Sequence, residues 1–160
     1  MTTARGMTSV LFGHMIAALL IAMIAPVSAF SQTYLGDVCW RVVADEETEE
    51  EESIVRLGVL DIGGNHFTMN GYSYSTDDES MDERTLLSGN AEVFGDRVFI
   101  HLNGSDSVSD ELVSIAFNAK ISTSTLNGSY EGIGTIFDRQ SKEIVTGVQT
   151  GMLTLITCPE

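Results

Sequence analysis

Gly36-Asp37-Val38-Cys39-Trp40-Arg41-Val42-Val43 is the stretch that decides the fold, because it holds one of only two cysteines in the chain. The other cysteine, Cys158, lies two residues before the C-terminal residue. Two cysteines in an exported protein are most simply a disulfide formed in an oxidising compartment. A metal pair would need further Cys or His ligands nearby in the sequence, and free thiols are the remaining alternative. A Cys39–Cys158 bridge would turn nearly all of the exported chain into one closed loop, worth about 5 kcal/mol on the chain-entropy model.

Residues 1–29 have the features of a secretory signal peptide. Arg5 precedes an apolar run from Val10 to Ile24, and Val27-Ser28-Ala29 supplies the small residues that a signal peptidase reads. The apolar run is shorter than the roughly 20 residues that cross a bilayer, which argues against a retained anchor. We therefore predict one exported domain over 30–160, in the bacterial periplasm or outside the cell, with no membrane insertion after removal of the leader.

The chain is strongly acidic, with a formal net charge of -15 at pH 7. Such a charge repels phosphate backbones and anionic lipid headgroups. Nucleic acid is therefore excluded as an expected partner, whereas a basic protein surface is not.

After the leader, apolar residues alternate with a period close to two, and no segment keeps a helical period. The clearest case is the segment from Leu112 to Ser122, in which Val113, Ile115 and Phe117 share one face and polar residues occupy the other. Gly95-Asp96 and Gly63-Gly64-Asn65 are typical of tight hairpin turns. The pattern predicts eight strands, over 38–43, 54–62, 66–74, 84–94, 97–103, 112–122, 126–137 and 144–158.

Short turns between consecutive strands favour an antiparallel up-and-down meander. With an even number of strands, the start of the first strand and the end of the last lie at the same end of the sheet. Cys39 and Cys158 occupy those two places. We therefore predict an all-β, eight-stranded antiparallel barrel whose first and last strands pair and are joined by the disulfide, with a two-sheet β-sandwich as the alternative.

This topology gathers most of the acidic residues in the loops at the end away from the cysteines. Clustered carboxylates can bind a hard cation such as Ca²⁺, but no spacing matches a twelve-residue calcium loop, and a solvated acidic loop is the plainer interpretation. We expect no cofactor beyond weak calcium binding and no confident metal site. The candidate cation ligands are Asp45, Glu46, Glu47, Asp77, Asp78 and Glu79.

The expected architecture resembles the calycin barrels, which include lipocalins and avidins. Gly36 and Trp40 near the start of the first strand are similar to a lipocalin pattern, and Leu126-Asn127-Gly128-Ser129-Tyr130 is similar to the glycine and aromatic pattern of avidin strands. Lipocalins, however, place this glycine and tryptophan two residues apart rather than four. Trp40 is the only tryptophan, so the biotin-binding tryptophans of avidins have no counterpart. The resemblance implies a barrel that can hold a small ligand.

Some residues are expected to face such a ligand, although core packing explains the same pattern. Glycines on an inward face either let a strand coil sharply or leave space for a ligand. We expect the two mature histidines, His66 and His101, to lie apart on the outer surface. The candidate ligand-facing residues are Trp40, Tyr130, Gly128, Gly132 and Gly134.

The sequence contains no serine elbow, unpaired nucleophilic cysteine or zinc-binding helix motif, so we do not expect an enzyme. We expect an exported binding module that engages a small apolar ligand or a partner, either at the acidic rim of long loops or in the barrel interior. The alternative is a protein-interaction or inhibitor barrel without a cavity that recognises a basic surface.

Overall fold

The computed structural model describes residues 32–45, 52–76, 84–108 and 111–159. The predicted leader, residues 1–29, lies outside these ranges and stays a prediction. The described residues form eight strands, which are β1 (Thr33–Ala44), β2 (Ser53–Gly63), β3 (His66–Ser75), β4 (Thr85–Phe94), β5 (Arg97–Val108), β6 (Glu111–Ser122), β7 (Gly128–Asp138) and β8 (Ile144–Ile156).

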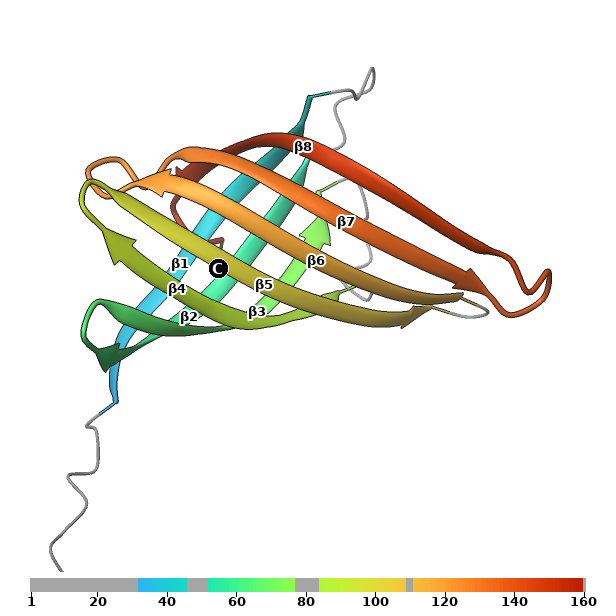
Figure 1. Ribbon diagram of the computed structural model, residues 1–160, viewed down its shortest axis with the longest axis horizontal. Helices are drawn as coiled ribbons and strands as arrows, with labels where there is room; N and C mark the ends of the chain where they lie inside the picture. The colour runs from blue at the N-terminus through green and yellow to red at the C-terminus, as the bar shows by residue number, and fades with distance from the viewer. Residues whose placement is uncertain (1–31, 46–51, 77–83, 109–110, 160) are drawn as a thin grey trace, which may run out of the picture. The chain divides into compact units, whose positions relative to one another are not determined.

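The strands form a closed antiparallel barrel in sequence order, β1 to β8 (Figure 1). Closure comes from β1 and β8, which pair from Cys39 opposite Ile156 to Ala44 opposite Gly151. The predicted eight-stranded barrel is confirmed, and the β-sandwich alternative is wrong. Within the described ranges there is no helix, and so none that could span a bilayer.

The predicted disulfide between Cys39 and Cys158 is confirmed, with Cα atoms 5.1 Å apart and a sequence separation of 119 residues. Cys39 follows the alternation of β1, so its side chain lies on the opposite face from Trp40. It is nevertheless completely buried. Its cross-strand neighbour Arg56 donates a hydrogen bond to the carbonyl oxygen of Pro159 at 3.0 Å. Arg56 therefore holds Pro159, the residue after Cys158, close to the disulfide.

The barrel interior alternates large side chains with glycines around the sheet. Leu57 of β2 lies opposite Gly71 of β3, which lies opposite Leu87 of β4, which lies opposite Gly104 of β5. A Cβ atom at Gly71 would lie 1.9 Å from the carbonyl oxygen of Arg56, so only glycine allows the strands to come this close. The glycines let the strands coil tightly, and the leucines fill the space above them.

The strands differ in length at the end of the barrel away from the disulfide. Pairing between β1 and β8 ends at Ala44 and Gly151, although β8 begins seven residues earlier, at Ile144. Figure 1 shows β7 and β8 extending together past the ends of β1 to β4. We call the part of β7 and β8 beyond this point, residues 133–149, the hairpin extension. The prediction placed the eight strands correctly but made β1 and β5 shorter than they are.

Candidate binding cavity

A cavity of about 920 Å³ occupies the end of the barrel that carries the disulfide and the tight turns. It is open to solvent, and side chains from β1 to β6 form its wall. The segment Leu155–Cys158 borders it on one side. The main apolar wall residues are Val59, Phe67, Met69, Val93, Val98, Ile100, Ile121 and Leu126.

Side-chain size explains why the cavity lies at this end. The middle of the barrel is filled by bulky residues, of which Leu57, Leu102 and Leu153 are at most 1% exposed. Towards the disulfide end the inward positions of β4 and β5 are the shorter Ala91 and Val98. These short side chains do not meet across the barrel, so an apolar space remains above the packed core.

Trp40 separates the cavity from the packed core. It is 3% exposed, belongs to the core cluster and also lines the cavity. Its indole Nε1 donates a hydrogen bond of 2.7 Å to the carbonyl oxygen of Leu126 in the turn between β6 and β7. Leu126 has a positive φ of 55°, a conformation that turns its carbonyl away from the strand ladder. Trp40 thus connects β1 to the turn between β6 and β7, past β8, and fixes the floor of the cavity.

The rim of the cavity near β1 is organised by Asp37. Its carboxylate accepts hydrogen bonds from the Tyr34 hydroxyl and, at 2.9 and 2.7 Å, from Nε and an Nη atom of Arg56. The bond from Tyr34, followed by the bonds from Arg56, lowers the pKa of Asp37 below its usual value. The same contact raises the pKa of Tyr34, because the hydroxyl must stay protonated to donate. Asp37 is therefore already engaged in contacts that fix the rim.

The cavity wall offers a ligand apolar contact and little else. Besides Asp37, the side chains with oxygen atoms at the wall are Thr123 and Thr157. In the described ranges, no buried side-chain nitrogen or oxygen lacks a hydrogen-bond partner. A charged ligand group would lose its hydration in this space without gaining a buried partner. The chemistry of the cavity therefore suits an apolar, uncharged molecule.

The structure separates the candidate ligand-facing residues into different roles. Trp40 lines the cavity, whereas Tyr130 packs in the core and stacks on Phe117 at 5.0 Å between ring centroids. A Cβ at Gly128 would lie 2.1 Å from the carbonyl oxygen of Lys120, so Gly128 marks a place where the strands approach closely. A Cβ at Gly134 would meet nothing within 4 Å. None of the three glycines from β7 lines the cavity.

Of the six candidate cation ligands, only Asp45 lies in the described ranges. Its backbone N–H donates to the carbonyl oxygen of Thr150 at 2.8 Å, and its carboxylate accepts from the Thr150 hydroxyl at 2.8 Å. Among the described residues no three His, Cys, Asp or Glu side chains converge as metal ligands. Weak calcium binding remains untested, because the other five candidates lie outside the described ranges, namely Glu46, Glu47, Asp77, Asp78 and Glu79.

The two histidines are closer than we expected from the sequence. Both face outward as predicted, but His66 and His101 line the same surface depression of about 360 Å³, on the outer side of β3 to β6. A ring nitrogen of His66 lies 4.0 Å from the carboxylate of Glu92, and Nδ1 of His101 lies 2.6 Å from Oδ1 of Asn118. The expected separation is wrong because β5 runs on to Val108, so that His101 lies in its first half, and the register carries His66 across Glu92 of β4 to Phe99, two residues from His101.

Sequence reasoning expected binding at the acidic rim or in the barrel interior, and it did not indicate that the interior is open at the disulfide end. The inward residues near the Gly95-Asp96 turn carried the missing signal. On the inward face, Ala91, Val93 and Val98 are all smaller than the leucines at the middle of the barrel. A comparison of inward side-chain volumes along each strand would have indicated the open end.

Comparison of the chain with protein-family models, with curated proteins and with solved structures found no match. The resemblance to calycin barrels therefore stays a prediction.

Proposed function

We propose that this chain is a small-molecule binding barrel, that its site is the cavity at the disulfide end, and that its ligand is an apolar, uncharged molecule. The observation that carries the proposal is an open cavity of about 920 Å³ whose wall is almost entirely apolar. Ligand sites in proteins typically enclose about 300–1,000 Å³ and combine an apolar wall with few polar groups. The function proposed is binding rather than catalysis, in an exported protein.

The interior is favoured over the acidic rim of long loops as the binding place. The cavity wall belongs to paired strands fixed by Trp40 and by the disulfide, so it exists before a ligand arrives. The alternative of a cavity-less interaction barrel has no support from this interior. Recognition of a basic surface by the rim would depend mainly on acidic loop residues outside the described ranges.

The physical chemistry of the wall limits the class of ligand. Burial of apolar surface contributes roughly 25 cal/mol per Å², so affinity would come from a molecule that covers much of the wall. An anionic ligand is disfavoured twice, by the net charge of -15 and by the absence of a buried cation among the described residues. A compact neutral hydrophobic molecule avoids both costs.

Titration with the neutral fluorescent probe N-phenyl-1-naphthylamine tests the proposal. Trp40 is the only tryptophan, and it lines the cavity, so energy transfer from Trp40 to the probe reports binding close to the cavity floor. Ala91→Phe fills the cavity from β4 and is expected to weaken probe binding at least tenfold. The matched control is Ala116→Phe, which adds the same ring to the outward face of β6, away from the cavity, and should leave binding unchanged.

A second cavity variant, Val93→Phe, places the ring closer to the mouth and keeps the test valid if Ala91→Phe does not fold. The proposal predicts saturable energy transfer that both cavity variants reduce and the control does not. Absence of binding by the folded wild-type protein, or binding that the cavity variants leave unchanged, would contradict it.

A further inference from the structure

The first part of β8 has one strand edge without a partner in the described part of the chain. From Ile144 to Val148, β8 pairs with β7 on one side only, because β1 reaches no further than Ala44. The last hydrogen bond from the β1 side to β8 before this stretch is the one from the Asp45 N–H to the Thr150 carbonyl oxygen. We call Ile144–Val148 the open edge.

The direction of the backbone groups on the open edge follows from that last bond. In an antiparallel strand the N–H and C=O of one residue point to the same side, and the side alternates along the chain. The carbonyl of Thr150 points towards β1, so the N–H and C=O of Ile144, Thr146 and Val148 point to the open side as well. The odd-numbered residues between them use theirs for pairing with β7.

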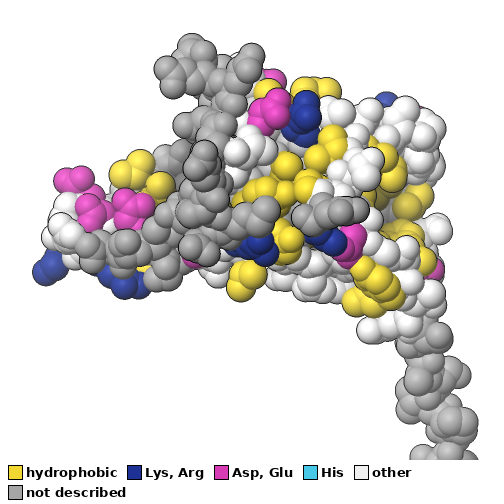
Figure 2. Space-filling model, turned by 180° about the vertical axis from the view of Figure 1, so that it is seen from behind, with side chains coloured by type: hydrophobic (Ala, Val, Ile, Leu, Met, Phe, Trp, Pro, Cys, Tyr) yellow, Lys and Arg dark blue, Asp and Glu magenta, His cyan; other side chains and the backbone are white. Residues whose placement is uncertain are grey.

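The open edge has none of the features with which proteins usually protect an edge strand. Such edges carry charges, prolines or bulges, whereas the whole of β8 contains no charged residue and no proline. Apolar side chains are exposed on both faces of the sheet here, with Ile144 68%, Val145 61% and Val148 64% exposed. Figure 2 shows hydrophobic side chains beside acidic and basic ones at this end of the molecule.

The hairpin extension is nevertheless held in a defined shape. The carboxylate of Asp138 accepts hydrogen bonds from the N–H groups of Gln140 and Ser141 and from the Ser141 hydroxyl, at 2.7, 3.2 and 2.8 Å. The backbone of the turn closes through Lys142 N–H to the Asp138 carbonyl oxygen at 2.9 Å. These bonds keep β8 extended, so the open edge is ready to pair without reorganisation.

We propose that the open edge pairs with the open edge of a second copy of this chain, giving a symmetric dimer with a sheet that continues from β8 of one copy into β8 of the other. This inference is independent of the ligand proposed above. Antiparallel pairing centred on Thr146 places Ile144 opposite Val148 of the other copy, so each outward-pointing N–H finds a carbonyl. The same register keeps each sheet face continuous, because residues opposite each other then have the same parity.

Side-chain chemistry also fits a second copy. On one face, Ile144 and Val148 form cross-strand β-branched pairs in both halves of the dimer. On the other face, Val145 lies opposite Gly147, whose missing side chain leaves open space. The segment is thus complementary to itself on both faces, which an unrelated strand would match only by coincidence.

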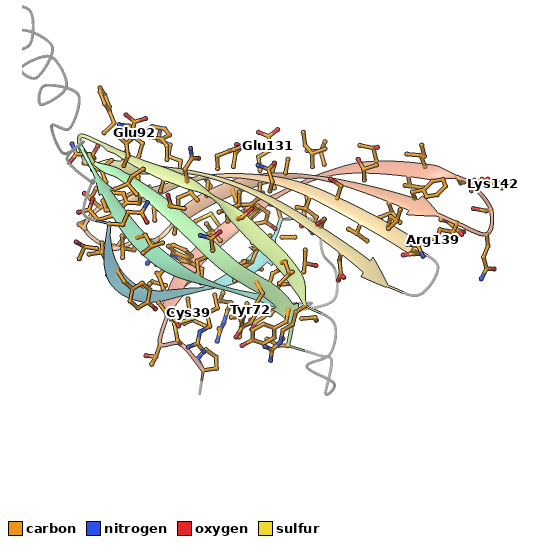
Figure 3. All side chains as sticks on the ribbon, turned by 90° about the horizontal axis from the view of Figure 1, so that it is seen from below. Cys39, Tyr72, Glu92, Glu131, Arg139 and Lys142 are labelled. Atoms are coloured by element: carbon orange, nitrogen blue, oxygen red, sulfur yellow. A yellow bond between two sulfur atoms is a disulfide. The ribbon has the colours of Figure 1, made fainter. Side chains whose placement is uncertain are left out.

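Charge complementarity supports the same register. Pairing centred on Thr146 directs the turn that carries Lys142 of one copy towards the end of β1 of the other, where Asp45 occupies the position opposite Thr150 and its carboxylate accepts from the Thr150 hydroxyl. Figure 3 shows Lys142 and Arg139 at the far end of the hairpin, away from Cys39. Each copy would therefore direct the Lys142 ammonium group towards an acidic group of the other, although the turn as a whole carries two basic and two acidic residues.

Sedimentation equilibrium over a range of protein concentrations tests the dimer with Thr146→Pro. Proline removes the N–H that points to the open side and leaves the bonds to β7 in place, so the dimer should be lost while the monomer stays folded. The matched control is Thr146→Ala, which also loses the 3.2 Å contact between the Thr146 and Thr135 hydroxyls but keeps the N–H, and should still dimerise. A wild-type protein that is monomeric at every concentration would overturn the proposal, as would a dimer that Thr146→Pro leaves intact.

Hydrogen exchange on the wild-type protein gives a readout that needs no variant. The amides of Thr146 and Val148 should exchange at least tenfold more slowly at high than at low protein concentration, whereas the Val145 amide, already paired with β7, should change much less. Lys142→Glu should weaken the dimer, and the charge-matched control Lys120→Glu, on β6 away from the open edge, should not. Concentration-independent exchange at Thr146 and Val148 would show that the edges do not pair.

Discussion

The indole Nε1 of Trp40 lies 2.7 Å from the carbonyl oxygen of Leu126, and this hydrogen bond joins the first strand of the barrel to the turn before the seventh. Because both residues line the cavity, the bond holds two walls of the candidate site at a fixed separation. Trp40, which follows Cys39 in the stretch that decides the fold, thus also shapes the site.

Trp40→Phe keeps an aromatic ring but removes the donor to Leu126. We expect a loss of about 1–3 kcal/mol in the free energy of unfolding, since a partly buried carbonyl is left without its bond. Urea denaturation followed by circular dichroism measures it. The control is Tyr34→Phe, which removes an aromatic hydrogen bond at a residue that is 60% exposed and should cost less. Equal costs for the two variants would mean that the Trp40 bond does not fix the barrel wall.

Gly89→Ala should destabilise the barrel strongly. The added Cβ would lie 1.9 Å from the carbonyl oxygen of His101, so β4 and β5 would have to separate. We expect at least the roughly 1–3 kcal/mol typical of overpacking. Gly134→Ala is the matched control, because its Cβ meets nothing within 4 Å, and it should change the melting temperature little. If both variants melt alike, close strand approach at Gly89 does not determine the coiling of the sheet.

Replacement of both cysteines, Cys39→Ala with Cys158→Ala, should lower stability by up to about 5 kcal/mol on the chain-entropy model. It should also weaken probe binding, because the segment from Leu155 to Cys158 borders the cavity. The comparison variant is Arg56→Gln, which releases both the Pro159 carbonyl and the Asp37 carboxylate but leaves the disulfide in place, and so separates the covalent bond from the hydrogen bonds beside it. Unchanged probe affinity in the double variant would show that the C-terminal segment is not needed for the wall.

The rim should loosen in acid through Asp37. Hydrogen bonds from Tyr34 and Arg56 lower the folded-state pKa of Asp37, so its contribution is fully present above the unfolded value of about 3.9. It is lost as the pH falls through the lower folded-state pKa. The pKa of Tyr34 is raised, so its contribution is lost only at alkaline pH. The difference in melting temperature between wild type and Asp37→Asn should shrink below about pH 4, and a difference that stays constant would contradict this.

The sequence was sufficient to predict the barrel, and the reason is visible in particular residues. Alternation in β6, from Val113 to Ile121, identified an inward and an outward face, and these are the faces that the structure has. Cys39 and Cys158 determined closure, because a meander with an even number of strands brings its two ends together. Local periodicity and one covalent constraint were enough for the topology.

Features that depend on strand tilt and register could not be read from local pattern. His66 and His101 share a depression although they lie on different strands, and Tyr130 stacks on Phe117 in the core. The open edge at Ile144–Val148 exists because β1 and β8 differ in length, and nothing within β8 itself reveals where its neighbour ends.

Chemical-shift mapping of methyl groups during titration with N-phenyl-1-naphthylamine tests the central claim most directly, because it locates the bound apolar molecule. The exposed apolar side chains Ile144 and Val145 are the competing place where a hydrophobic probe could adsorb. The account predicts saturable shifts at Val98, Ile100 and Ile121 in the cavity wall, and none at Ile144 or Val145. Shifts confined to the hairpin extension, with an undisturbed cavity wall, would contradict it.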